Sequence, residues 1–109
     1  MKRSKIGPKY SKVTRAIWGD GKFTGLSRSA PCAQMLFLRL LTAPELSPFP
    51  GLIPIGRLGL CEALDWDPED LDRCFAELHA KGMALADWKV RLVWLPKAFA
   101  HNPPESPNV

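Results

Sequence analysis

The sequence is poor in the residues that build disulfide scaffolds and metal centres. It has three cysteines and two histidines, and no two cysteines form a CxxC pair. An odd number of widely spaced cysteines argues against a disulfide framework, and a structural zinc site needs about four closely spaced ligands. Each cysteine falls in an apolar helical pattern, which is typical of a buried free thiol. We therefore expect no metal or disulfide, and a reducing, cytoplasmic setting, for Cys32, Cys61 and Cys74.

The chain also lacks a long apolar run. The longest one, Met35 to Leu41, is interrupted by Arg39 and is far too short to cross a bilayer. The basic N-terminus has no apolar segment behind it, so we expect no secretory signal. A membrane is therefore not among the expected partners.

Motifs that carry catalysis are missing as well. There is no phosphate-binding loop, no HExxH and no recognisable Ser-His-Asp arrangement. His79 and His101 are separated by Gly82 and by a predicted hairpin. We expect a protein that is not an enzyme and needs no cofactor.

What the sequence does have is an uneven distribution of charge. The net charge is +4 at pH 7, but residues 1–28 alone hold eight Lys or Arg and one acid, a net of +7. Residues 29–79 hold three bases and eight acids, a net of −5, and residues 80–109 carry +2. Such separation is more informative than the total, because a basic terminal segment is a common nucleic-acid-binding device.

Apolar periodicity predicts three helices. The first covers residues 29–42, with Ser29 as its N-cap and Pro31 in its first turn. The second covers residues 57–64. The third begins after the cap Asp67 and ends at Gly82, and its buried stripe has helical spacing and consists of Leu71, Cys74, Phe75 and Leu78.

Short extended segments accompany these helices. Residues 51–55 predict an edge strand, because Pro54 cannot donate to a central one. Residues 83–86 and 90–95 predict a hairpin with residues 87–89 between its strands. Residues 10–18 fit either a strand or a helical turn, and residues 19–21 predict a turn.

The order helix, short strand, helix, turn, helix, hairpin is that of a winged helix-turn-helix. We therefore predict an α+β domain with a three-helix core and a β-hairpin wing over residues 13–98. Residues 1–12 are expected to be a basic flexible arm, and residues 99–109 a Pro-rich tail or linker.

The third predicted helix carries five carboxylates from Asp67 to Glu77 against one base, Arg73. Acids near a helix N-terminus complement the helix dipole, by ~0.3–1 kcal/mol each, which is the simplest explanation. A contact to cytosine is a weaker alternative, because three acids near phosphates would repel them. A protein partner that covers this face is a third. Arg73 is expected to contact DNA or to pair with Glu69 or Glu77 one turn away.

The tryptophans divide between core and surface. Trp94 alternates with Val90 and Leu92, so we expect it in the core, and Trp18 and Trp66 are also expected to be structural. Trp88 at the hairpin tip has two open interpretations: it stacks on a base or sugar, or it folds back on the strands.

The chain resembles the N-terminal winged-helix domain of phage and prophage DNA-replication proteins of the replisome-organiser type. The resemblance rests on "VTRAIWGDGKFTGLS", "GLIPIGRLGLCEALDW", "FAELHAKGMALADWKVRLVWLP" and "HNPPESPNV", about three quarters of the chain. It implies a DNA-binding module of a larger protein, whose further C-terminal region contacts replication proteins. The oligomeric state, including a homodimer, stays open.

These observations predict a domain that binds double-stranded DNA largely through its arm and wing. Each phosphate contact would add roughly −0.9 to the slope of log affinity against log salt. The candidate DNA-binding residues are Lys2, Arg3, Lys5, Lys9, Lys12, Arg15, Arg57, Arg73, Trp88, Lys89 and Arg91.

The alternative is a winged-helix module for protein interaction or dimerisation. It would use the acidic helix face together with the exposed apolar residues Leu46, Phe49 and Trp88. The arrangement of the bases in the wing and helices discriminates between the two. A connected basic surface favours DNA, and interruption by acids favours a protein partner.

Overall fold

The computed structural model describes residues 13–45, 49 and 51–96. The expected arm, residues 1–12, and the expected tail, residues 99–109, lie outside this part of the chain, as does Leu46 of the alternative interaction surface. The boundaries predicted for those two segments are therefore not tested.

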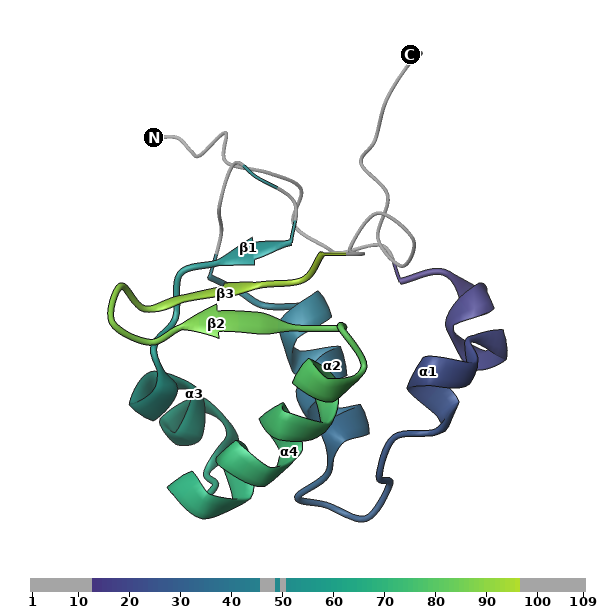
Figure 1. Cartoon of the computed structure of the whole chain (residues 1–109), viewed down its shortest axis with the longest axis horizontal. Coiled ribbons are helices and arrows are strands. Elements are labelled where there is room, and N and C mark those ends of the chain that lie inside the picture. Colours follow the sequence, from purple (N-terminus) through teal and green to yellow (C-terminus); the bar gives the residue numbers. More distant parts are fainter. Residues whose placement is uncertain (1–12, 46–48, 50, 97–109) are drawn as a thin grey trace.

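Helices and a small sheet form two layers (Figure 1). A 3₁₀ turn η1, Arg15–Gly19, and a short helix α1, Gly21–Thr24, precede the longer helices. These are α2 (Ala33–Leu41), α3 (Arg57–Leu64) and α4 (Pro68–Ala80), and both α2 and α3 pack against α4. The described residues thus contain the three main helices that the sequence predicts, preceded by two short elements.

The sheet is antiparallel, with strand order β1-β3-β2, and lies above the helices in Figure 1. Its strands are β1 (Leu52–Ile53), β2 (Leu85–Asp87) and β3 (Leu92–Trp94). Ile53 pairs with Val93, and Val93 pairs with Ala86 on its other side. This row faces the helices, because Ile53 and Val93 are buried and Ala86 packs against the core. The α+β class is confirmed.

The predicted stripe of α4 is confirmed, since Leu71, Cys74, Phe75 and Leu78 are all buried. All three cysteines are free and buried, as the sequence predicts. Burial raises the pKa of the Cys61 and Cys74 thiols.

Backbone features at the helix ends follow their residue types. Asp65 ends α3 in the left-handed conformation (φ 58°), which Asp tolerates better than most residues. Gly82, just past α4, has φ 69°, as expected of a glycine at this position. Asp67 is the N-cap residue of α4, but its side chain makes no cap hydrogen bond, so this prediction is correct in position only.

The predicted start of the first long helix is wrong. It begins at Ala33, not at Ser29, and the capping hydroxyl is that of Ser27, whose Oγ accepts from the Ala33 N–H at 2.8 Å. The Glu77 carboxylate in turn accepts from the Ser27 N–H (2.8 Å) and Oγ–H (2.9 Å). Glu77 therefore ties α4 to the start of α2, and it does not belong to the acidic outer face.

The predicted inward side of the second hairpin strand is also wrong by one residue. Val93 is fully buried, whereas Trp94 is 52% exposed and Val90 is 60% exposed. Trp94 pairs with Leu52 on one side and Leu85 on the other. Since directly opposed residues share a face, these three form an outward apolar row.

The N-terminal region is more helical than predicted. Asp20, expected in a turn, is the N-cap of α1 and accepts from the Lys22 N–H at 2.9 Å. Helix α1 buries Phe23 completely, and the Trp18 ring lies edge-on to it at 5.5 Å. Trp18 is 67% exposed, so its structural role is limited to this contact with Phe23, whereas Trp66 packs against the core.

Candidate nucleic-acid interface

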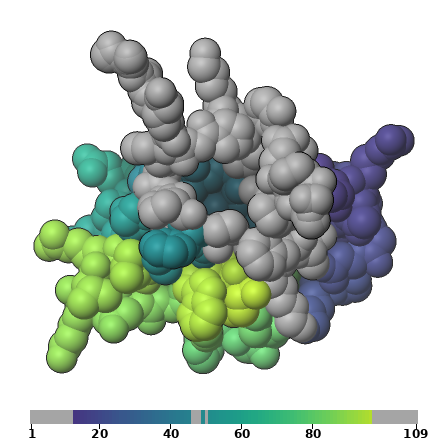
Figure 2. Space-filling model, turned by 90° about the horizontal axis from the view of Figure 1, so that it is seen from above, coloured from purple at the N-terminus to yellow at the C-terminus, as the bar shows by residue number. Residues whose placement is uncertain are grey.

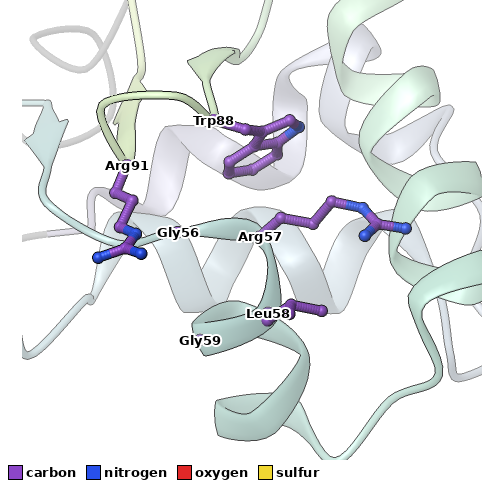
Figure 3. Close-up of a pocket in the computed structure, with 6 residues that line it drawn as sticks. All are labelled: Gly56, Arg57, Leu58, Gly59, Trp88 and Arg91. Carbon is purple, nitrogen blue, oxygen red and sulfur yellow. The ribbon is translucent and has the colours of Figure 1, made fainter.

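A hollow of about 450 Å³ lies between the start of α3 and the β2–β3 turn. Figure 3 shows its lining residues, and in Figure 2 the lime-green turn projects at one end of the molecule. The lining residues are Gly56, Arg57, Leu58, Gly59, Trp88 and Arg91. Helix α3 begins here without a side-chain cap, because its N-cap residue is Gly56. Its first N–H groups have no partner within the helix.

Arg57 is the first residue of α3, and it forms a salt bridge with a carboxylate. Its Nε and Nη2 each donate to Asp72 of α4, both at 2.8 Å. This hydrogen bond raises the pKa of Arg57 and lowers that of Asp72. The stem of Arg57 lines the hollow, while its guanidinium extends toward α4 (Figure 3).

Arg91 lies across the hollow, in the four-residue turn 88–91. Its backbone has φ 59°, a conformation that an arginine rarely adopts. Its stem lies close to Gly56, where a Cβ would come within 3.0 Å of Arg91 Cγ. The missing side chain of Gly56 therefore lets the turn approach α3. In Figure 3 the Arg57 guanidinium extends toward α4 and away from Arg91.

Trp88 folds back onto the domain. Its ring lies 5.3 Å from that of Phe75 in an edge-on arrangement, and it packs against the core. The ring is thus folded back, but onto α4 and not onto the strands as the second interpretation had it, and Trp88 still lines the hollow. Lys89 and Val90 are the exposed residues next to it in the turn.

Arg73 is not among the residues that line the hollow. Its Nη2 donates to the Pro31 carbonyl at 3.2 Å and lies 3.4 Å from the Asp70 carboxylate. The expected partners Glu69 and Glu77 are therefore wrong. Of the bases in α3, α4 and the turn, Arg57 and Arg91 line the hollow, and Lys89 lies in the same turn as Arg91. Arg57 and Arg73 each form a salt bridge with an acid.

Arg15 is exposed in η1. This element, purple in Figures 1 and 2, lies at the opposite end of the molecule from the lime-green turn. The structure therefore does not bring Arg15 together with the hollow. The other candidate bases lie outside the described residues, namely Lys2, Arg3, Lys5, Lys9 and Lys12.

The described part of the chain is slightly acidic. It holds nine Lys or Arg and ten Asp or Glu residues, a net of −1, whereas residues 1–12 hold five bases and no acid. The positive excess of the whole chain therefore comes from residues 1–12.

Sequence reasoning missed two parts of this site. One is Asp72 as the partner of Arg57, fifteen residues away. The other is the close approach of the turn to Gly56, for which the glycine directly before Arg57 was the available signal.

Other kinds of site are not visible in the residues described. No group of three or more His, Cys, Asp or Glu side chains there is arranged to hold a metal ion. In the same residues, no helix has the length and apolar character needed to span a bilayer.

Comparisons with known proteins give no relative. No family model, no curated protein and no solved structure matches this chain.

Proposed function

We propose that the chain is a winged-helix module that binds double-stranded DNA, with the β2–β3 turn as its wing. The observation that carries the proposal is the hollow that Arg57 and Arg91 line at the uncapped start of α3. Free helix N–H groups and arginine side chains are both common phosphate ligands. The strand order β1-β3-β2 behind α2, α3 and α4 agrees with this fold.

Most of the electrostatic attraction comes from residues 1–12 in this proposal. The described body is net −1 and five acidic residues lie between Asp67 and Glu77, so the body alone attracts phosphate weakly. DNA approaches the wing and the start of α3 and avoids the acidic start of α4. The resemblance to replisome-organiser domains suggests a role for such binding in replication, with replication proteins as further partners.

Fluorescence anisotropy with a labelled random duplex, measured from low to moderate salt, tests the proposal. We expect affinity to fall steeply with salt, and deletion of residues 1–12 to reduce the slope by up to roughly 4.5, since each lost contact contributes about 0.9. Arg91→Gln should reduce it by about 0.9. Arg28→Gln is the matched control, because Arg28 is exposed and does not line the hollow. Absence of duplex binding at protein concentrations on the order of 100 μM in low salt would contradict the proposal.

A second candidate is a protein-interaction module. The outward row of Leu52, Trp94 and Leu85 favours it, because a half-exposed tryptophan in an apolar row is typical of contact surfaces. Pairing of Arg57 and Arg73 with acids favours it too. The two functions differ in their response to salt, since apolar association persists where phosphate contacts are screened.

A further inference from the structure

We propose that Asp72 limits the affinity for DNA by occupying Arg57, the arginine at the edge of the hollow, in the free protein. This inference rests on the proposed DNA binding and names a residue that determines its strength. Asp72 is itself not expected to touch DNA.

The geometry of the pair carries the argument. Two parallel N–H···O bonds of 2.8 Å join Arg57 to Asp72, and a carboxylate in this arrangement presents the same two oxygens that a phosphate would. The pair uses the Nε–Nη2 edge of the guanidinium and cancels its charge. In the free protein, Asp72 therefore occupies the guanidinium edge of Arg57 that a phosphate group would otherwise contact.

Arg57 lies where a phosphate can replace Asp72 as its partner. Its stem already lines the hollow, opposite Arg91, and only its guanidinium is turned toward α4 (Figure 3). Asp72 lies on the exposed side of α4, and the side chains of the pair are 35% and 54% exposed. Because the pair is open to solvent and lies on the surface, a phosphate at the hollow can compete for Arg57 without unfolding the domain.

The test is Asp72→Asn in the full chain, compared with wild type by anisotropy on the same labelled duplex. Releasing Arg57 adds about one phosphate contact, so the salt slope should steepen by about 0.9 and affinity should rise by up to roughly eightfold at 0.1 M salt. Circular dichroism melting verifies that the variant is folded.

Two further variants separate release of Arg57 from simple loss of negative charge. Glu69→Gln removes the same charge from α4, one turn before Asp72, where Glu69 acts on Arg57 only through space. It should raise affinity less and leave the slope unchanged. In an Arg57→Gln background, Asp72→Asn should lose its effect on the slope.

The outcomes distinguish this inference from the proposed function. Wild-type protein that binds no DNA would contradict both. If wild-type protein binds DNA but Asp72→Asn does not raise the affinity, only the role of Asp72 would be overturned. The same holds if Asp72→Asn raises the affinity equally in the Arg57→Gln background. A gain no larger than that of Glu69→Gln, with an unchanged slope, would overturn it as well.

Discussion

Single side chains join segments that are far apart in the sequence. Glu77 is the clearest case, because its two carboxylate oxygens bind the N–H and hydroxyl of Ser27, whose oxygen caps α2 at Ala33. The three groups are part-buried, so water replaces the lost hydrogen bonds only in part. One carboxylate thus contributes both to the position of α4 and to the start of α2.

Glu77→Gln should lower the free energy of unfolding by about 1–3 kcal/mol, the range for hydrogen bonds to charged groups in part-buried surroundings. Urea denaturation measures this. Glu62→Gln is the control, because Glu62 is exposed on α3 and a surface change of this kind stays within about 0.5 kcal/mol. Equal denaturation midpoints for the two variants would show that the Glu77 contacts add no stability.

At the scale of elements, the short strands depend on their neighbours for orientation. Strand β3 has three residues, and its sequence LVW is apolar on both faces, so alternation alone does not show which face is buried. Pairing decides it. Val93 lies between Ile53 and Ala86 over the helices, while Trp94 lies between Leu52 and Leu85 on the outer face.

Two substitutions to serine test this orientation. Val93→Ser removes a fully buried side chain and buries a hydroxyl, which should cost about 2–4 kcal/mol of unfolding free energy. Trp94→Ser should cost less than about 1 kcal/mol, as for most surface changes. Thermal or urea unfolding of both proteins gives the comparison. The reverse ranking would mean that Trp94 faces the core.

At the scale of the whole molecule, the excess of basic residues and the described buried apolar residues lie in different parts of the chain. Among the described residues, the buried apolar cluster extends from Ile17 to Leu95, whereas residues 1–12 carry five bases. Removing residues 1–12 changes the net charge from +4 to −1 and takes no residue from that cluster. We therefore expect the proposed DNA binding to be separable from folding.

The variant without residues 1–12 should keep the circular dichroism spectrum and the cooperative unfolding of the full chain, because its buried cluster is intact. It should also stop binding to a cation-exchange resin at pH 7. Loss of the helical spectrum would show that these residues support the fold, and loss of DNA binding would then have a structural cause.

The sequence by itself determined the features that depend on consecutive residues. Helical spacing predicted α3 and the buried stripe of α4, residue type predicted Gly82 at the end of α4, and composition predicted free buried cysteines. Each of these follows from local backbone geometry or from the number of residues of one kind.

Only the tertiary structure decided which distant residues meet. Ser27 and Glu77 are fifty residues apart, and Arg57 and Asp72 fifteen, so no local period relates them. The outward position of Trp94 depends on the strands beside it, and the hollow depends on how closely the turn approaches Gly56. Such contacts arise from the packing of α3, α4 and the sheet, because packing brings together side chains that the chain itself keeps far apart.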